Sequence, residues 1–392
     1  MFMTDTRSLA AQLQRFRNSA FKIGVGGLVL SGIGFLLDPN QAFVSYLYAF
    51  LFWSSASLGS MGLLLLYHVV GGYWGLAIRR PLEAAVGNVS MVALAFVPLV
   101  FGIKTLYLWA RLEVVALDPL LQHKAIYLNE NSWVIRSIFY LAVWMVTARS
   151  LIILSRREDE DPGGPSEFRL QQLAPVGLIL YVLTVTFASM DWGMSLEPHW
   201  ISTIYGLVFI MGQAIIGLAL SVLTLATFRE SREIREVLVP AHFHDIGTLT
   251  FAFVMLWAYM ALSQFLIIWS ANIPEEVHWF QHRLHGGWEY LGLFVIAFQF
   301  IFPFFALLSR TVKRNPEVLA KVAIALLAVR VVDMYWTIVP SLYPHSIHFH
   351  LLDICALAGL GGVWVSRYLD NLASSELFPD HIASQLEGAK HG

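Results

Sequence analysis

Several acidic and basic side chains lie inside or at the ends of strongly apolar segments, where they could carry protons. Asp191 stands near the end of one such segment, and Glu197, Pro198 and His199 follow before the next apolar segment begins. Because Pro198 cannot continue a helix, this stretch predicts a turn between two helices with carboxylates at its tip. In lipid an ionisable group near such a tip is costly unless it is paired or hydrated. The pattern indicates either a functional acid–base group or an acid that only caps the turn.

Other apolar segments carry ionisable groups at the same depth. Arg330 and Asp333 are three residues apart and can pair on one helical face, and His350 and Asp353 repeat that spacing. The acids and bases together would nearly neutralise one another. They predict either a polar cavity that forms the outer half of a proton pathway or a salt-bridge cluster that only holds helices together. The outer candidates are Asp191, Glu197, His199, Glu289, Arg330, Asp333, His350, Asp353, Lys104 and Arg136.

A second set of ionisable groups lies near the ends of the apolar segments that are predicted to face the cytoplasm. His244, Asp245, Glu83 and His68 are the candidates for an inner entry of the pathway, although groups at helix ends are often simply solvated. Most aromatic side chains are expected to form interfacial belts and helix packing. The weak candidates for an aromatic quinone cleft are Trp192, Trp200, Tyr205 and Trp336.

Histidines are numerous in the segments predicted to lie outside. The runs His278-x-x-x-His282-x-x-His285 and His345-x-x-His348-x-His350 have spacings compatible with metal ligation, but neither matches a specific metal motif. We therefore predict no metal site and interpret these histidines as proton-relay or partner-docking groups.

The elements that position these groups are predicted to be membrane-spanning helices. The chain has 392 residues, of which 57% are hydrophobic and only 13% charged, and its mean hydropathy of +0.64 is typical of a polytopic membrane protein. Ten apolar segments are long enough to cross a bilayer. They lie near residues 21–37, 42–67, 85–109, 132–154, 173–196, 201–227, 246–270, 286–308, 317–340 and 350–368.

The distribution of basic residues predicts the orientation. Most Lys and Arg residues fall on one side of the predicted spans, and the other side receives only Arg111, Lys124 and Arg283. By the positive-inside rule both termini are expected in the cytoplasm. We predict a cytoplasmic N-terminal segment at 1–20, an all-α membrane domain of about ten transmembrane helices at 21–369, and a cytoplasmic C-terminal tail at 370–392.

The sequence also limits the redox chemistry that this chain can hold by itself. Cys355 is the only cysteine, which excludes Cys-ligated iron–sulfur clusters and a C-x-x-C-H haem attachment within the chain. A phosphate-binding loop of the G-x-x-x-x-G-K-[ST] type is absent as well. Any electron transfer must therefore take place on other subunits.

Longer motifs resemble a known family. Across roughly residues 50–370 the sequence resembles the ActF family of membrane proteins, which are components of bacterial alternative complex III, a quinol:electron-acceptor oxidoreductase. The motifs that carry the resemblance are Asp191-Trp192-x-Met194-Ser195-Leu196-Glu197-Pro198-His199-Trp200, His242-x-His244-Asp245-Ile246-Gly247, Gln264-Phe265-Leu266-Ile267-Ile268-Trp269-x-Ala271-Asn272-Ile273-Pro274-Glu275-Glu276, Ser309-Arg310-x-x-Lys313-Arg314-Asn315 and Arg330-x-x-Asp333-x-x-Trp336.

This resemblance implies an NrfD-like fold with two four-helix bundles, at about 42–196 and 201–340, flanked by the first and last helices. It implies a place in the bacterial inner membrane beside an NrfD-like sister subunit that oxidises quinol, an iron–sulfur subunit and c-type cytochrome subunits. Menaquinone or ubiquinone would serve the complex, while iron–sulfur clusters and c-type haems would sit on the partners. We expect lipid contacts, no nucleic acid, and a contribution to proton translocation.

Two alternatives stay open at the level of the sequence. In one, the chain is a purely architectural subunit of the same respiratory or photosynthetic complex, and its buried charges only stabilise the assembly. In the other, it is a free-standing proton-coupled transporter, a class in which broken helices near the middle of the membrane are expected.

Overall fold

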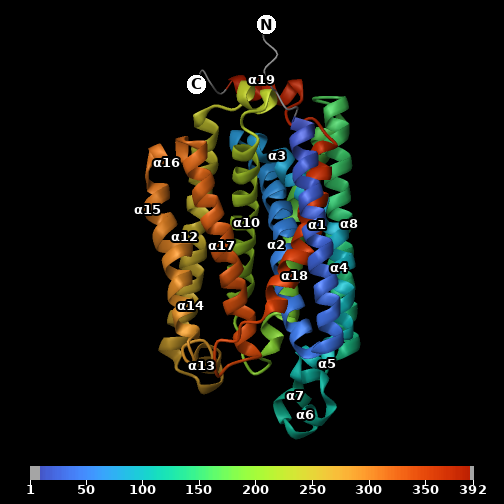
Figure 1. Ribbon diagram of the computed structural model, residues 1–392, viewed down its shortest axis with the longest axis vertical. Coiled ribbons are helices and arrows are strands. Elements are labelled where there is room, and N and C mark those ends of the chain that lie inside the picture. The colour runs from blue at the N-terminus through green and yellow to red at the C-terminus, as the bar shows by residue number, and fades with distance from the viewer. Residues whose placement is uncertain (1–8, 389–392) are drawn as a thin grey trace.

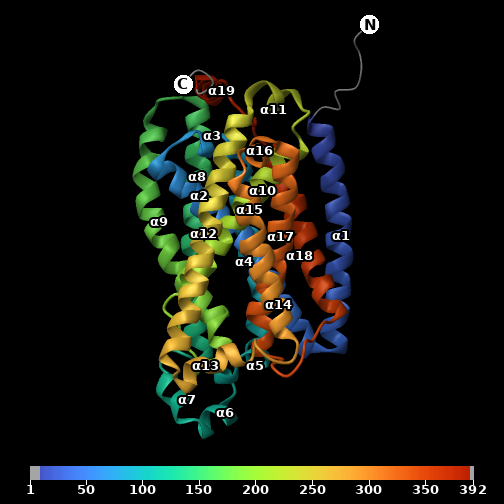
Figure 2. The same cartoon turned by 90° about the vertical axis from the view of Figure 1, so that its left-hand side faces the viewer.

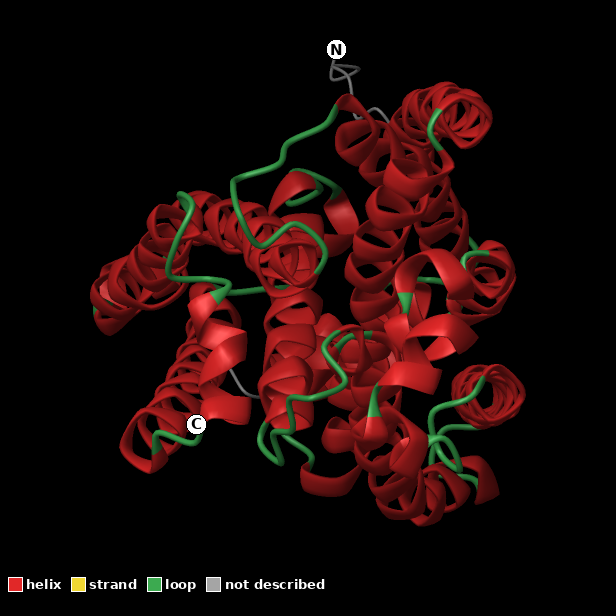
Figure 3. Cartoon of the chain, turned by 90° about the horizontal axis from the view of Figure 1, so that it is seen from below, coloured by secondary structure: helices red, strands yellow, loops and turns green. Residues whose placement is uncertain are grey.

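The protein is a bundle of long helices, described here from a computed structural model that covers residues 9–388. The first eight residues of the predicted N-terminal segment and the last four of the predicted tail lie outside the described residues. Within 9–388 ten helices are long and apolar enough to cross a membrane, so the prediction of an all-α, multi-pass membrane protein is confirmed. Seen along its long axis, the described chain forms only helices and loops (Figure 3).

The ten spans are continuous or composed of consecutive helical pieces. They are α1 (Leu9–Leu37), α2 (Pro39–Val70), α3 (Tyr73–Val86) with α4 (Val89–Phe101), α8 (Glu130–Glu160), α9 (Pro165–Trp192), α10 (Tyr205–Thr227), α12 (Pro240–Ala271), α14 (Trp288–Val295) with the π-helical η3 (Ile296–Ile301) and α15 (Phe302–Leu308), α17 (Pro316–Ile338) and α18 (Leu351–Ala373).

Short elements connect the spans at the two ends of the molecule (Figure 1). The end at which α1 begins and α19 lies is called the terminal end, and the other the opposite end. The short elements are α5 (Ile103–Leu106), η1 (Leu108–Ala110), α6 (Leu112–Leu117), α7 (Pro119–Lys124), η2 (Met194–Leu196), α11 (Arg232–Val237), α13 (Pro274–Gln281), α16 (Arg310–Arg314), η4 (Val339–Ser341) and α19 (Asp380–Gly388).

Local sequence explains where α2 begins and ends. The side chain of Asp38 accepts a hydrogen bond from the backbone N–H of Gln41 (3.1 Å), and Pro39 occupies the first position of the helix, where its missing N–H costs nothing. After the last turn, Gly71 and Gly72 have φ angles of 68° and 105°. Residues with a side chain rarely adopt such angles, so this glycine pair ends α2 and reverses the chain into α3.

For description we divide eight of the spans into two groups of four. Bundle one comprises α2, α3 with α4, α8 and α9, and bundle two comprises α10, α12, α14 to α15, and α17. The two bundles meet where α2 contacts α10, and α18 lies against α2 with α1 on its outer side. Figure 2 shows α1 beside α18 at one edge of the molecule and α9 at the opposite edge.

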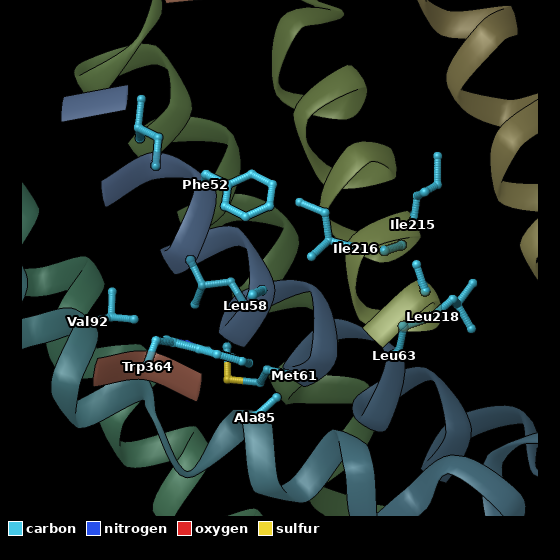
Figure 4. Packing of buried hydrophobic residues seen from close by; sticks show 14 of the residues in the cluster. Phe52, Leu58, Met61, Leu63, Ala85, Val92, Ile215, Ile216, Leu218 and Trp364 are labelled. Carbon is cyan, nitrogen blue, oxygen red and sulfur yellow. The ribbon is translucent and has the colours of Figure 1, made fainter. Parts of the chain in front are cut away.

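The core lies around α2 and α10. In the most apolar part of α2, 89% of the residues are buried, whereas the share is 22% in α1, in α12 and in the span formed by α14 to α15. Figure 4 shows Phe52 and Leu58 of α2 in the same packed region as Ile215 and Ile216 of α10. The peripheral helices therefore turn large apolar faces outward, as expected of helices in contact with lipid.

Close packing of α1 on α18 depends on glycine. A Cβ atom at Gly24 would lie 2.5 Å from the backbone nitrogen of Val363, and one at Gly27 would lie 2.5 Å from that of Gly359. Small residues let the two backbones approach, which is how helices associate where lipid removes the hydrophobic driving force. This contact holds the first span against the last.

Several boundaries differ from the sequence prediction, and the first span already begins at Ala11, within the predicted cytoplasmic segment 1–20. The third span begins at Tyr73 rather than at residue 85, and it ends at Phe101 rather than at 109. The charged residues near its start suggested a loop, but they are helical and buried in ion pairs. At the other end of the chain α18 extends to Ala373, and α19 follows within the predicted tail, with Ile382 and Leu386 buried.

Candidate functional site

Asp191 lies at the centre of a polar cluster in bundle one. Its side chain is 0% exposed, and Arg136 of α8 donates two hydrogen bonds of 2.8 Å, one from Nε and one from Nη2, to its two carboxylate oxygens. Tyr140 Oη donates a third, of 2.9 Å. The Arg136 guanidinium also lies over the ring of Tyr127, 3.7 Å from its centroid. The acid at the end of α9 is thus buried and held by three hydrogen bonds from α8.

Glu197, just beyond α9, is paired with a residue that the sequence prediction did not include. Arg283 is 0% exposed and donates from Nη1 to Glu197 Oε1 (2.8 Å), and Ser341 Oγ donates to the same oxygen (2.6 Å). His282 Nδ1 lies 3.1 Å from Glu197 Oε2. Burial favours protonation of Glu197, but Arg283 and the neighbouring donors outweigh it and hold the pKa at about 2.

Arg283 also connects two segments of the chain. Its Nη2 donates to the backbone oxygen of Thr337 and to Ser341 Oγ, both at 2.7 Å, and its guanidinium lies 3.7 Å from the centroid of the Trp279 ring. The sequence showed it only as one of three basic residues on the predicted outer side. The need of Glu197 for a partner among so few bases was the signal that could have identified Arg283.

Arg330 and Asp333 form an ion pair inside bundle two. Both side chains are less than a tenth exposed, and Arg330 Nη1 donates to Asp333 Oδ2, as the three-residue spacing predicts. Gly212 of α10 provides the space for the guanidinium, because a Cβ atom there would collide with it. Within residues 9–388, Arg330 Nε has no hydrogen-bond partner. The pair is therefore buried, but one hydrogen-bond donor of Arg330 has no acceptor in the described part of the chain.

Asp353 joins three helices near the opposite end. It accepts hydrogen bonds from Ser45 Oγ of α2 (2.5 Å), from Tyr335 Oη of α17 (3.1 Å) and from the backbone N–H of His350 (2.9 Å). Gln41 Nε2 of α2 lies 3.2 Å from the same carboxylate. The spacing of His350 and Asp353 reflects a helix cap and not an ion pair.

Three of the outer candidates stand apart from these clusters. Lys104 is 72% exposed in α5, outside the third span, and lies 3.6 Å from Glu130, so its predicted position within a helix of the membrane is wrong. Glu289 accepts a hydrogen bond from the backbone N–H of Gly287 at the start of α14 (2.9 Å). His199 Nε2 lies 2.7 Å from Asp118 at the surface.

The outer groups thus occupy several clusters instead of one network. Tyr205 lies between two of them, within electrostatic range of Glu197, Arg283 and Asp333. Two pockets, one lined by Arg310 and Arg314 and the other by Arg80 and Glu83, lie at the terminal end, away from these acids. The arrangement offers buried acid–base groups at several depths, and a proton crossing from one cluster to the next would need water between them.

The inner candidates are placed at the terminal end in two groups. Glu83 Oε1 accepts from Arg79 Nε (2.8 Å), and its Oε2 accepts from Arg80 Nη1 (2.5 Å). The same two arginines also pair with Glu158 and Asp159 of α8, both at 2.5 Å. This five-membered ion network is the largest in the described chain, and sequence analysis assigned only one of its members.

The other inner candidates are more accessible. His244 Nδ1 lies 3.3 Å from Asp245 Oδ1, and the side chain of Asp245 is 50% exposed. His68 is half-buried, and its ring lies against that of Tyr67 with centroids 4.9 Å apart. His244 and Asp245 therefore lie within reach of water at the terminal end, whereas His68 packs within the end of α2.

Three of the four quinone candidates gather around one tryptophan. Trp200 stacks on Trp279 with centroids 4.6 Å apart and an interplanar angle of 14°, and Trp336 meets Trp279 edge-on at 5.7 Å. Tyr205 packs against Trp200 at 5.5 Å. Trp192 lies elsewhere, in the core of bundle one. These rings pack against one another and form a small aromatic cluster at the opposite end of bundle two.

Neither a protein-family model nor a curated protein matches this sequence. The resemblance to alternative complex III therefore stays a prediction from the motifs. The ten-helix fold and the buried acid–base clusters are the observations from which a function can be proposed.

Proposed function

We propose that this chain is a membrane subunit of a quinol-oxidising electron-transfer complex of the alternative complex III type, in which it supports proton translocation. It packs against the quinol-oxidising sister subunit in the bacterial inner membrane, with both termini in the cytoplasm. The excess of basic residues at the terminal end supports this orientation. Quinone, iron–sulfur clusters and c-type haems belong to the partners.

The observation that carries the proposal is the enclosed pair of Arg330 and Asp333. A buried ion pair is a poor source of stability, because hydrophobic residues of similar volume often serve as well or better. An ionisable group at this depth is therefore a functional group by default. The unpartnered Nε of Arg330 leaves a donor free for water, which is what a proton path through bundle two requires.

In this proposal the acid–base groups act in sequence. His244 and Asp245 exchange protons with the cytoplasm, Asp333 holds a proton in the outer half of the path, and protons leave past Asp191 and the ionised Glu197 at the opposite end. Arg330, Arg136 and Arg283 donate hydrogen bonds to the three carboxylates and set their positions. Ordered water bridges the gaps between the clusters.

A second candidate, an architectural subunit, is favoured by the geometry at Asp191. Both carboxylate oxygens of Asp191 accept hydrogen bonds within bundle one, two from Arg136 and one from Tyr140. Such a saturated pair fixes α8 against α9 and has no need to release a proton. Under this reading, neutralising the buried acids lowers the yield of the complex without changing its coupling.

Purification of the chain from its native membrane under mild detergent tests the assignment to a complex. The expected result is co-purification with c-type cytochrome and iron–sulfur subunits, detected as haem absorbance and bound iron in a constant ratio to this chain. A chain that purifies alone, without haem or iron, would contradict the proposal and would favour a free-standing transporter.

A further inference from the structure

An open pocket of about 610 Å³ lies at the terminal end of bundle two. It is formed where the chain leaves α10, where α12 begins, and where α16 leads into α17. Its lining residues are Arg229, Pro240, Arg310, Thr311, Arg314, Asn315, Pro316 and Glu317. The proposed proton pathway makes no use of this pocket, although part of the lining belongs to the Ser309-Arg310-x-x-Lys313-Arg314-Asn315 motif.

Positive charge dominates the lining. Arg229 is held by Glu317, with Nη2 and Oε1 2.5 Å apart. Arg310 and Arg314 are exposed, and within residues 9–388 neither is paired with a carboxylate. Arg229 Nε also lies 3.1 Å from Glu230, so Arg229 holds both nearby carboxylates and leaves Arg310 and Arg314 without a counter-ion in the described chain. Planar guanidinium groups match the oxygens of a phosphate group.

Two further features add to the positive potential. Asn315, Pro316 and Glu317, at the N-terminus of the 23-residue α17, line the pocket, so the positive end of the helix dipole lies beside it, although Asn315 already accepts from the N–H groups of Glu317 and Val318. Lys313 extends towards α12, where its Nζ donates to Thr248 Oγ1 (3.1 Å). Burial, and after it the nearby Arg310, lower the pKa of Lys313.

The last turns of α15, which precede Arg310 in the chain, expose apolar side chains. Phe305 and Leu308 of α15 are 68% and 54% exposed and lie within the last turns of the span, immediately before Arg310. A ligand with an anionic head and hydrocarbon chains matches this order of charged and apolar residues, because its head can lie beside the arginines while its chains lie along α15. A soluble anion would use only the upper half of the surface.

We propose that this pocket binds the phosphate of an anionic phospholipid, with Arg310 and Arg314 as the principal headgroup contacts and its acyl chains along Phe305 and Leu308. Basic pockets between transmembrane helices on the cytoplasmic side are suited to such headgroups. Arg229 is held in place by Glu317 and completes the rim. The lipid thereby fills the gap between α10, α12 and α17 at this end.

Native mass spectrometry of the purified full chain, with any subunits that accompany it, tests this proposal. The probes are phosphatidylglycerol, phosphatidylcholine with the same acyl chains, and inorganic phosphate. We expect phosphatidylglycerol to bind at least about tenfold more tightly than phosphatidylcholine, and inorganic phosphate to compete weakly. In the variant Arg310→Gln/Arg314→Gln the preference for phosphatidylglycerol should disappear.

The matched control is Arg157→Gln/Arg169→Gln, which removes the same charge from exposed positions at the same end. It should keep the lipid preference of the natural chain, and both variants should keep its melting temperature because all four side chains are exposed. Equal affinity for the two lipids, or an equal loss of preference in the control, would overturn the proposal. Tight binding of inorganic phosphate that needs Arg310 and Arg314 would replace the lipid with a soluble phosphate ligand.

Discussion

Replacement of Glu197 by Gln should destabilise the opposite end of bundle two, because it leaves the charge of Arg283 buried without a counter-ion. Arg283 is 0% exposed and lies 2.8 Å from Glu197 Oε1. Loss of one partner from a buried ion pair costs about 3–5 kcal/mol. The depression of the pKa of Glu197 from 4.5 to about 2 gives a similar figure, about 3 kcal/mol. Gln still accepts a hydrogen bond from Arg283, so the lower value applies.

The same pair predicts a pH dependence whose sign is fixed by the direction of the shift. The pKa of Glu197 is lower in the folded than in the unfolded chain, so its stabilisation is complete above about pH 4.5 and is lost as the pH falls towards about 2. The Gln variant has no carboxylate at this position. The difference in stability between the two proteins should therefore shrink over that range of pH.

Thermal unfolding in detergent, followed by tryptophan fluorescence, measures both effects. A loss of about 3 kcal/mol should lower the melting temperature by roughly 5 °C at pH 7. Lys104→Met is the control, because the pair of Lys104 with Glu130 is exposed and worth less than about 1 kcal/mol. The reasoning would be refuted if the Glu197→Gln variant had the melting temperature of the natural chain, or if the difference between their melting temperatures did not change below pH 4.5.

Two further predictions concern packing and charge in the interior. Gly59→Ala should lower the free energy of unfolding by about 1–3 kcal/mol, because the new Cβ atom would collide with the backbone of Gln213 where α2 meets α10. The control is Gly32→Ala, which faces open space and should leave the melting temperature unchanged or slightly higher. Equal effects of the two substitutions would contradict the close approach of α2 and α10. Arg136→Met should cost about 3–5 kcal/mol because it leaves Asp191 buried without its partner, and addition of Asp191→Leu should recover much of that loss. Additive losses in this double-mutant cycle, measured by thermal unfolding, would show that the two residues are not coupled.

The number and type of spans could be predicted from the sequence because lipid imposes a simple condition. A helix that crosses a bilayer needs about twenty apolar residues, and no other local structure satisfies its backbone groups there. The ten apolar segments therefore correspond to the ten spans of the structure. Short-range spacing was equally informative at Arg330 and Asp333, which pair within one turn of a helix.

Pairings between distant segments could not be predicted in this way. Arg79 and Arg80 resembled loop residues because the sequence does not show that Glu158 and Asp159 of α8 approach them. Asp353 similarly depends on Ser45, which is 308 residues away in the chain. A buried charge is a sign that a partner exists, but only the packing of helices determines which residue supplies it.

The central claim of this account is that the buried acids move protons, and the ratio of protons translocated to electrons transferred tests it most directly. The measurement uses the purified complex in liposomes and compares the natural chain with Asp333→Asn and Asp191→Asn. We predict a lower ratio for both variants in the complex that assembles, and a lower yield of complex because each substitution removes the counter-ion of an arginine, Arg330 or Arg136. Full coupling in both variants, with or without a lower yield of complex, would contradict the claim and leave the buried charges with a structural role.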